Sequence, residues 1–320
     1  MRHMDSVLVT GGAGFIGSNF VHHMLHETNC RVINLDKLTY AGNLRNIKDL
    51  RHDKRHKFVR GDIRNRKLVR SLVGKVDAVV NFAAESHVDR SIRAPGIFVE
   101  TNVLGTQVLL DACRKPGIRF QQISTDEVYG SRLEGSFKET DTLNPSSPYS
   151  ASKAAADLLV NAYCTTYSLD ATVTRSTNNY GPNQHPEKLI PRLITNALRR
   201  KSLPLYGNGQ NVRDWIFVED NCRAIRVALE KGVRGQIYNV AGGNENRNVD
   251  IAAEILQRLS LPQTMIEFVD DRPGHDFRYS LNCERIKRLG WEPRIDFREG
   301  LQKTIDWYTS NEWWWRPLVD

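Results

Sequence analysis

Two adjacent carboxylates occur in the segment ISTDEVYG, residues 123–130, directly after an apolar run. Asp126 and Glu127 carry like charges, which repel each other and are easier to keep in open solvent. When two carboxylates are held close together their pKa values separate, so one stays protonated as an acid while the other is ionised as a base. Elimination of water needs such a pair. The alternative is structural, with Asp126 capping a short helical turn and Glu127 facing solvent.

A tyrosine and a lysine lie four residues apart in PYSASK, which places Tyr149 and Lys153 on one face of a helix. A phenol with an ordinary pKa of about 10 is a poor base at neutral pH, but a nearby ammonium group lowers that pKa. Tyr149 is therefore suited to removing the proton of a hydroxyl group. Thr125, at the end of the preceding predicted strand, completes a Thr–Tyr–Lys set.

The stretch VLVTGGAGFIGS contains two overlapping glycine fingerprints, made by Gly11, Gly12, Gly14 and Gly17. This loop follows a predicted strand and opens an amphipathic helix, where backbone amides bind a pyrophosphate. Asp36 ends the second predicted strand, and a carboxylate there binds ribose hydroxyls and repels a 2′-phosphate. The sequence therefore predicts NAD rather than NADP, a preference that Lys37 slightly weakens.

The elements that position these residues alternate in type. Strands are predicted at 6–10, 31–36, 56–61, 78–84, 119–125 and 171–176, and the clearest helices at 15–27, 98–115 and 149–168. Strands that alternate with helices indicate an α/β fold with a Rossmann-type, doubly wound parallel sheet. Its ligands are expected beyond the carboxyl ends of the strands.

After residue 177 the pattern is less regular and predicts a smaller C-terminal substrate-binding lobe. Its helices are predicted near 188–200, 219–231, 248–259, 283–289 and 297–312, around a strand at 265–269. A strand at 236–242 is predicted to return to the main sheet. The expected domains are 4–177 with 213–242 for NAD, and 178–212 with 243–320 for the substrate.

Composition limits the class of protein. The 320 residues are 40% hydrophobic, which is enough for a substantial core. Five scattered cysteines suit reduced thiols, and no apolar stretch reaches the ~20 residues of a spanning helix, so a cytoplasmic, non-membrane protein is expected. The net charge is +8, and its densest basic run, 48–70, lacks a nucleic-acid motif. That run is interpreted as a solvated face, and no nucleic-acid partner and no metal site are predicted.

Taken together, the motifs resemble the dTDP-glucose 4,6-dehydratases, a family of extended short-chain dehydrogenases/reductases. The resemblance covers nearly the whole chain, through TGGAGFIGS, DKLTYAGNL, FAAESHVDRSI, STDEVYG, SPYSASKA, NNYGP, PEKLIP, LPLYGNGQNVRDW and DRPGHDFRY. It implies a lyase of deoxysugar biosynthesis, such as the formation of rhamnose, and a homodimer paired through the helices at 98–115 and 149–168.

The resemblance also implies a role for each catalytic residue. Tyr149 would take the proton of the sugar's 4-hydroxyl while hydride passes from carbon 4 to NAD⁺, with Thr125 bonded to that oxygen and Lys153 bonded to the nicotinamide ribose. Glu127 would then remove the carbon-5 proton. Asp126 would protonate the departing 6-hydroxyl, and the hydride would return to carbon 6.

The resemblance assigns further residues to the two ligands. NAD would contact the glycine loop with Phe15 and Ile16, then Asp36, Lys37, Leu38, Thr39, Asp62, Ile63, Phe82, Ala83, Ala84, Glu85, Ser86, Thr101 and Asn179. The substrate dTDP-glucose would contact Ser86, Thr125, Asn178, Lys188, Leu189, Pro204, Leu205, Tyr206, Arg213, Asn248, Asp271, Arg272, Pro273, Gly274 and His275. Lys188 and Arg213 would supply the cations that a diphosphate needs, the alternative for each being a surface ion pair.

The sequence departs from the family's pattern at Asn183, where an aromatic residue is frequent, and at Ser176-Thr177. Two other functions stay open at this point. One is another NAD-dependent nucleotide-sugar enzyme, such as a 4-epimerase or a UDP-glucuronate decarboxylase, and Asp126-Glu127 disfavours it because epimerisation expels no hydroxyl. The other is a non-catalytic NAD-binding protein, which the intact Thr125, Tyr149 and Lys153 disfavour.

Overall fold

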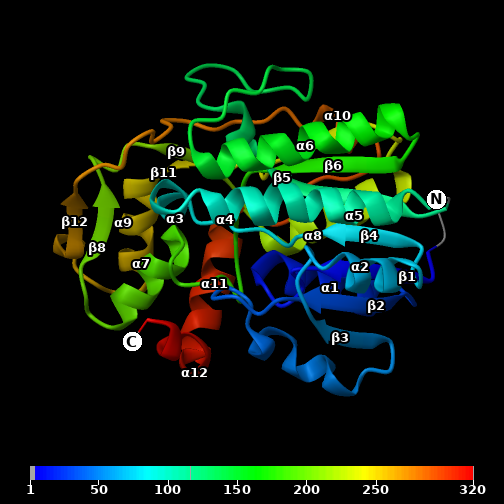
Figure 1. Cartoon of the computed structure of the whole chain (residues 1–320). Helices are drawn as coiled ribbons and strands as arrows, with labels where there is room; N and C mark the ends of the chain where they lie inside the picture. The colour runs from blue at the N-terminus through cyan, green and yellow to red at the C-terminus, as the bar shows by residue number, and fades with distance from the viewer. Residues whose placement is uncertain (1–3, 116, 320) are drawn as a thin grey trace.

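A seven-stranded parallel sheet in the order β10-β6-β5-β4-β1-β2-β3 forms the centre of the molecule (Figure 1). The structure, a computed structural model, describes residues 4–115 and 117–319. The strands are β1 (Ser6–Thr10), β2 (Arg31–Asp36), β3 (His56–Arg60), β4 (Ala78–Asn81), β5 (Arg119–Thr125), β6 (Asp170–Ser176) and β10 (Ile237–Val240). Strand β1 lies between β2 and β4, so the strand order reverses there and leaves a crevice for ligands. The predicted parallel sheet is confirmed, as is the return of the 236–242 segment to it.

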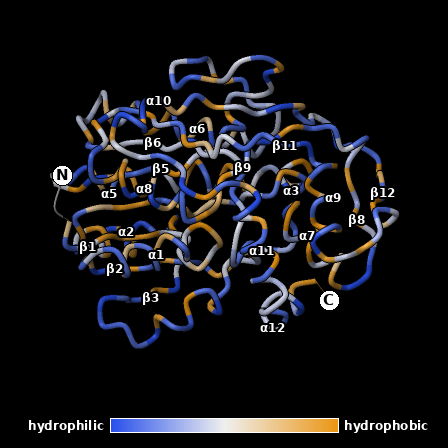
Figure 2. Tube along the Cα trace, turned by 180° about the vertical axis from the view of Figure 1, so that it is seen from behind, coloured by the Kyte–Doolittle hydropathy of each residue, from blue (hydrophilic) through white to orange (hydrophobic). Residues whose placement is uncertain are grey.

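Helices cover both faces of this sheet. On one face pack α1 (Phe15–Glu27), α8 (Val218–Lys231) and the 3₁₀ segment η1 (Leu44–His52), and on the other α2 (Arg66–Val73), α5 (Gly105–Cys113) and α6 (Pro148–Thr166). Because the strands between them are covered on both sides, Val7, Leu8 and Val9 are all fully buried. Figure 2 shows that the turn leading into β3, which belongs to the basic run 48–70, is hydrophilic, in contrast to the apolar central strands.

The single helix predicted at 98–115 is divided in the structure. It consists of α4 (Gly96–Phe98), a π-helical segment η2 (Val99–Leu104) and α5, and is preceded by α3 (Val88–Arg93). A π-helical turn closes its hydrogen bonds over five residues instead of four, and such turns are frequent at functional sites. Thr101, a predicted NAD contact, lies in this segment.

A second core lies beyond the sheet. It includes β7 (Asn178–Tyr180), β9 (Val212–Phe217) and β11 (Glu245–Arg247) in one small sheet, β8 (Leu203–Tyr206) and β12 (Ile266–Val269) in another, and the helices α7 (Leu189–Leu198), α9 (Asn248–Arg258), α11 (Phe297–Ser310) and α12 (Glu312–Trp315). The remaining short elements of this part are η4 (Gln263–Met265), α10 (Glu284–Lys287) and η5 (Arg316–Leu318). Helices α7, α9, α11 and α12 pack around one apolar cluster with strands β8 and β9. Within the described residues, every helix is too short or too polar to cross a membrane.

Candidate active site

The two adjacent carboxylates lie on a short 3₁₀ turn at the carboxyl end of β5. This turn, η3 (Asp126–Tyr129), begins at Thr125, whose hydroxyl accepts a hydrogen bond from the Glu127 amide (3.3 Å) and donates one to Asp126 Oδ1 (3.0 Å). The capping residue is thus Thr125 and not Asp126. Asp126 is 2% exposed and Glu127 is half-buried, and both side chains line the same cavity. The solvent-facing alternative is therefore wrong.

A buried network holds the far end of this turn. The Tyr129 hydroxyl donates to Asn239 Oδ1 (2.9 Å) and accepts from the guanidinium of Arg175 (2.7 Å). Arg175 also forms an ion pair with Asp157 (2.9 Å), and both side chains are almost completely buried. Because breaking such a pair strands a buried charge, the network fixes η3 against β6, α6 and β10.

The environments of the two carboxylates differ. Burial, and then the neighbouring charge of Glu127, raise the pKa of Asp126 well above its ordinary value, and its Oδ2 atom has no hydrogen-bond partner among the described residues. Burial also raises the pKa of Glu127, but the cations Arg272 and Lys188 oppose that shift. Of the two carboxyl groups, Asp126 therefore keeps its proton more readily and Glu127 ionises more readily.

The raised pKa of Asp126 predicts that Asp126→Asn stabilises the protein at neutral pH. Above pH 3.8, the group's ordinary pKa, the folded chain keeps a proton that the unfolded chain loses, so its contribution disfavours folding more as pH rises. The penalty grows by up to about 1.4 kcal/mol per pH unit until the folded group ionises, and Asn has no proton to lose. The melting temperature of Asp126→Asn relative to the parent should therefore rise between pH 4 and pH 7.

Asp53→Asn is the matched control for this pH series. The backbone N–H and side chain of Arg55 lower the pKa of Asp53, so its stabilising contribution is present above its ordinary pKa and is lost as pH falls. Relative to the parent, the stability of Asp53→Asn should therefore stay nearly constant between pH 4 and pH 7, and the difference should shrink only below pH 4. Parallel melting curves for Asp126→Asn and the parent would contradict a raised pKa for Asp126.

Tyr149 and Lys153 extend from the first two turns of α6 into the same cavity. The Tyr149 phenol is hydrogen-bonded to Thr125, while burial and the carboxyl groups of Glu127 and Asp126 raise its pKa. The Lys153 ammonium donates to the carbonyl of Ile123. Its burial lowers the pKa of Lys153 to about 8, against the charge of Asp157 one turn further along the helix. Lys153 is thus poised to lose or keep its charge close to neutral pH.

The glycine loop connects β1 to α1 at the crevice in the sheet. A Cβ atom on Gly17 would lie 2.3 Å from the Gly11 carbonyl oxygen, so only glycine fits there. Helix α1 begins at Gly14 without a side-chain cap, which leaves the amides of its first turn available to a phosphate. Asp36 accepts hydrogen bonds from Ala13 N–H (2.9 Å) and Leu38 N–H (2.7 Å) at the loop's edge.

One cavity of about 310 Å³ brings most of the predicted residues together. The predicted residues that line it are Gly11, Gly14, Phe15, Ile16, Gly17, Asp36, Lys37, Thr39, Asp62, Ile63, Phe82, Ala83, Ala84, Glu85, Ser86, Thr101, Thr125, Asp126, Glu127, Tyr149, Lys153, Asn178, Asn179 and Lys188. It extends from the glycine loop to the carboxylate pair, along the carboxyl ends of β1, β2, β4 and β5.

Other predicted residues lie outside this cavity. Gly12 packs against Asn34: a Cβ atom on Gly12 would lie 2.2 Å from Asn34 Oδ1. Close packing therefore explains why this residue is glycine. Leu205 is 1% exposed in the second core, and Leu189 packs against that core. Also outside are Leu38, Pro204, Tyr206, Arg213, Asn248, Asp271, Arg272, Pro273, Gly274 and His275.

Arg213, which was predicted to supply a cation to the diphosphate, is fixed by hydrogen bonds within the second lobe. Its guanidinium donates to the backbone carbonyls of Val212 (2.8 Å), Phe277 (3.0 Å) and Asp276 (2.7 Å), and it lies over the ring of Tyr279. It is 5% exposed. It is therefore not a surface ion pair: its guanidinium holds the segment that contains DRPGH, and its charge opposes the rise that burial causes in the pKa of Glu127.

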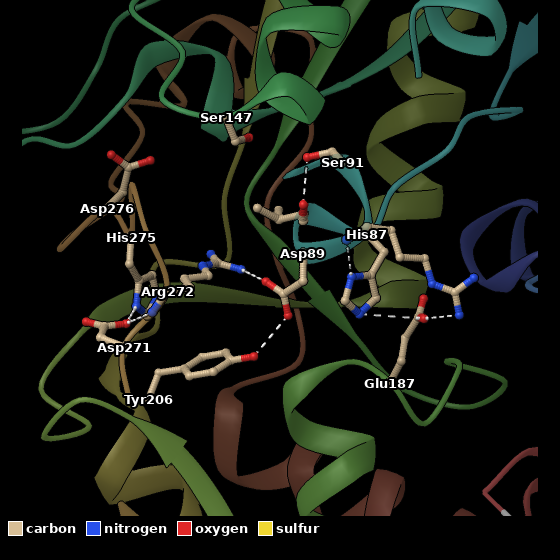
Figure 3. A network of polar contacts seen from close by, with 12 residues as sticks. His87, Asp89, Ser91, Ser147, Glu187, Tyr206, Asp271, Arg272, His275 and Asp276 are labelled. Atoms are coloured by element: carbon tan, nitrogen blue, oxygen red, sulfur yellow. Dashed lines mark hydrogen bonds and ion pairs between the residues drawn. The ribbon is translucent and has the colours of Figure 1, made fainter. Parts of the chain in front are cut away.

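A polar network connects that segment to the nucleotide-binding part. Figure 3 shows Asp89 of α3 between Arg272 and Tyr206 of the second lobe, with His275 beside Asp271. Asp89 accepts from the Tyr206 hydroxyl (2.9 Å) and pairs with Arg272 at 3.4 Å, while His275 lies 2.6 Å from Asp271. Two predicted substrate residues, Tyr206 and Arg272, thus contact one carboxylate that was not predicted.

A second unpredicted acid, Glu187, lies at the other side of this region. It pairs with Arg90 (3.4 Å) and with His87 (3.6 Å), and Figure 3 shows the contact with His87. Its neighbour Lys188 donates to the Ser86 carbonyl (2.7 Å). The unpredicted residues that line the cavity are Leu35, Ala41, Gly42, Gly61, Ile123, Ser124, Ser176, Thr177, Gln184, His185 and Glu187. Most of them lie at the carboxyl ends of strands, so the predicted parallel sheet was the signal that could have identified them as cavity-lining residues.

The two departures from the family's pattern have different surroundings. Asn183 has φ of +68°, a left-handed conformation that asparagine adopts more readily than most residues. Ser176 and Thr177 line the cavity, and the Ser176 hydroxyl donates to Asn221 Oδ1 (2.8 Å).

Comparison with known proteins agrees with this geometry. The family model described as GDP-mannose 4,6 dehydratase matches residues 8–304. The low-salt glycan biosynthesis protein Agl12 of Haloferax volcanii is 52% identical over 96% of this chain and 99% of its own length. The dTDP-glucose 4,6-dehydratase of Streptomyces antibioticus is 51% identical over 98% of this chain and 95% of its own.

A solved structure gives the same result. The crystal structure of DesIV, a dTDP-glucose 4,6-dehydratase from Streptomyces venezuelae with NAD and TYD bound, superposes with a TM-score of 0.96. It is 50% identical and covers 98% of this chain and 99% of the other. The resemblance inferred from the motifs is confirmed: this chain belongs to the GDP-mannose 4,6 dehydratase family, together with the dTDP-glucose 4,6-dehydratases.

Proposed function

We propose that this protein is an NAD-dependent dTDP-glucose 4,6-dehydratase, a hydro-lyase that forms dTDP-4-keto-6-deoxy-D-glucose. The observation that carries the proposal is the buried Asp126 beside Glu127, on a turn that also contacts Tyr149. With NAD as the hydride acceptor, oxidation or epimerisation of the sugar uses Thr125, Tyr149 and Lys153 and expels no hydroxyl. Expelling a hydroxyl needs an acid and a base in addition, and this site holds both.

The residues present fit a dinucleotide. The uncapped first turn of α1 and the close contact at Gly17 leave room and amide donors for a pyrophosphate. Asp36 faces the cavity at the end of β2, where it would bind the adenosine ribose. When bound, NAD supplies the reversible oxidation of the sugar that makes carbon 5 acidic and later reduces carbon 6.

Tyr149 is proposed to accept the proton of the 4-hydroxyl. In the protein without ligand its pKa is raised, so the cation of Lys153 four residues away and the positive charge of NAD⁺ have to favour the phenolate. Thr125, bonded to the phenol, holds the same sugar oxygen. Lys153 is proposed to bind the nicotinamide ribose.

Glu127 and Asp126 are proposed to divide the elimination between them. Glu127 takes the carbon-5 proton, and the electron pair left behind forms the bond between carbons 5 and 6. The 6-hydroxyl leaves as water with the proton of Asp126. The cations near Glu127 favour its ionised form, while burial keeps Asp126 protonated, so each group starts in the state that its step needs.

The second lobe is proposed to bind the nucleotide. Ser86, Asn178 and Lys188 line the cavity on the substrate side. Arg272 is proposed to bind the diphosphate, because only part of its charge is neutralised, through a 3.4 Å contact with Asp89. Arg213 is proposed to act indirectly, by fixing the segment from which Arg272 extends.

The direct test is a reaction without added cofactor. Purified protein is incubated with dTDP-glucose, and the product is examined by mass spectrometry for the loss of one water. The expected result is complete conversion by enzyme that carries and regenerates its own NAD. Unchanged dTDP-glucose, even with NAD supplied, would reject the proposal, and an epimer of unchanged mass would favour the rival 4-epimerase.

Three further expectations stay proposals. We infer a cytoplasmic location, which the five buried free cysteines support, since thiols persist in reducing compartments. A homodimer is supported by exposed apolar side chains on η2 and α6, among them Val99, Leu104 and Leu158, and the particle mass in solution tests it. The domain division is supported by β10 and α8, which join the Rossmann part from beyond residue 213.

A further inference from the structure

Three consecutive tryptophans, residues 313–315, lie within the short helix α12 near the C-terminus, and the proposed reaction does not use them. Trp313 is 46% exposed, whereas Trp314 and Trp315 are 2% and 1% exposed. Both buried indoles donate one hydrogen bond. Trp315 donates to the Tyr308 carbonyl of α11 (2.7 Å), within its own lobe. Trp314 donates to Asn46 Oδ1 (2.8 Å), which belongs to η1 in the nucleotide-binding part.

Asn46 connects this indole to the glycine loop. Its side chain is 4% exposed, and its Nδ2 atom donates to the carbonyl of Ala13 (2.9 Å). The Asn43 amide donates to the same carbonyl (2.9 Å), and the N–H of Ala13 donates to Asp36 (2.9 Å). Ala13 lies in the middle of the loop between Gly11 and Gly17. Both polar groups of its backbone are therefore held, the N–H by Asp36 and the carbonyl by Asn43 and Asn46 together.

The indole N–H determines which end of the Asn46 side-chain amide faces Trp314. An asparagine amide can turn over and exchange its oxygen and nitrogen, but an indole nitrogen can only donate. Trp314 therefore requires the oxygen of Asn46 to face it, which leaves the Nδ2 donor for Ala13. The Ala13 carbonyl can only accept, so it selects the same orientation, and the amide of Asn46 is held at both ends. Without the indole N–H the amide is held at the Ala13 end alone.

We infer that Trp314 is a positioning residue for the dinucleotide: through Asn46 it fixes the glycine loop in the conformation that binds the diphosphate of NAD. The inference rests on the proposed use of NAD. It also connects the second lobe to the cofactor, because α12 packs in the core formed by α7, α9 and α11. Figure 1 shows α12 at the end of the chain, below α11 and toward the sheet's β3 side.

Trp314→Phe in the full-length enzyme loaded with NAD tests the inference, with Trp315→Phe as the matched control. Each variant keeps a buried aromatic ring and loses one indole N–H, so a purely structural cost is similar in both. Arg45 bonds the backbone of residues 313 and 314 (3.3 and 3.4 Å), and this contact holds α12 in place in either variant. Only Trp314→Phe removes a partner of Asn46.

Two quantities are measured, the rate at which bound NAD is released into an excess of an NAD-consuming enzyme and the melting temperature. Trp314→Phe should release NAD about tenfold faster, the effect of losing about 1.4 kcal/mol, and Trp315→Phe less than about twofold faster. Both variants should melt at similarly lowered temperatures. Equal NAD release from the two variants would overturn the inference, whatever their melting temperatures.

Asn46→Ala provides a second route if Trp314→Phe does not fold. It should release NAD at least as fast as Trp314→Phe, and adding Trp314→Phe to it should cause no further change, because the two residues act through one contact. Release at the parent's rate from Asn46→Ala would overturn the inference. NAD release is independent of sugar turnover, so an enzyme that holds NAD but leaves dTDP-glucose unchanged would reject the proposed function alone.

Discussion

Glu127→Gln stops the reaction after the first oxidation, and kcat falls about a thousandfold. Gln has nearly the shape of Glu but accepts no proton, so the acidified carbon 5 keeps its hydrogen. The glycine loop, Tyr149 and Lys153 are unchanged, and the 4-hydroxyl is still oxidised. Mixing the variant with dTDP-glucose should therefore leave the near-ultraviolet absorbance of reduced nicotinamide on the protein.

The decisive comparison for Glu127→Gln uses deuterated water. The parent exchanges the carbon-5 hydrogen with solvent during turnover, and Glu127→Gln should show no exchange. Asp126→Asn is the matched partner, because it keeps the base and lacks the acid: it should exchange carbon 5 but lose water about a hundredfold or more slowly. Deuterium at carbon 5 in Glu127→Gln would show that another group is the base.

Tyr149→Phe blocks the reaction one step earlier, with kcat reduced by about three orders of magnitude. The phenylalanine ring fits the same site against Phe98, whose ring centroid is 6.4 Å from that of Tyr149, so the fold and NAD binding persist. The 4-hydroxyl then has no acceptor for its proton. Unlike Glu127→Gln, this variant should develop no absorbance of reduced nicotinamide with dTDP-glucose.

Tyr163→Phe is the matched control for Tyr149→Phe. It removes the same hydroxyl from the same helix, but that hydroxyl donates to Asp111 (2.7 Å), away from the cavity. Its kcat should stay within about twofold of the parent, because losing a part-buried hydrogen bond outside the cavity does not alter the catalytic groups. Appearance of reduced nicotinamide in Tyr149→Phe would assign the proton transfer to another group.

The sequence was informative about the main sheet because its signals are local. β1, β2 and β5 have the predicted bounds, and α1 has the predicted residues 15–27. Buried parallel strands are continuous apolar runs, which are easily read. The strands β7, β8, β9 and β11 were not predicted, because three to six residues rich in Asn, Pro and Arg show no alternation of apolar and polar side chains.

In the candidate site, too, local groupings of residues were predicted and long-range contacts were not. Thr125, Asp126 and Glu127 were predicted to lie together because they are consecutive at the end of one strand. Asp89 and Glu187 were not predicted, since their partners Arg272, Tyr206, Arg90 and His87 come from three distant parts of the chain. The contact between Trp314 and Asn46 spans 268 residues, and no spacing rule indicates it.

The contact between Asp89 and Arg272 has a consequence for product release. If Arg272 binds the diphosphate as proposed, an internal carboxylate competes with every nucleotide that enters or leaves the site. The substrate and the product carry the same diphosphate, so an unopposed arginine would retain both equally. Because Asp89 pairs with Arg272 again when the product dissociates, the product stays bound for a shorter time. The ground-state affinity for nucleotide falls, and the rate of catalytic turnover rises.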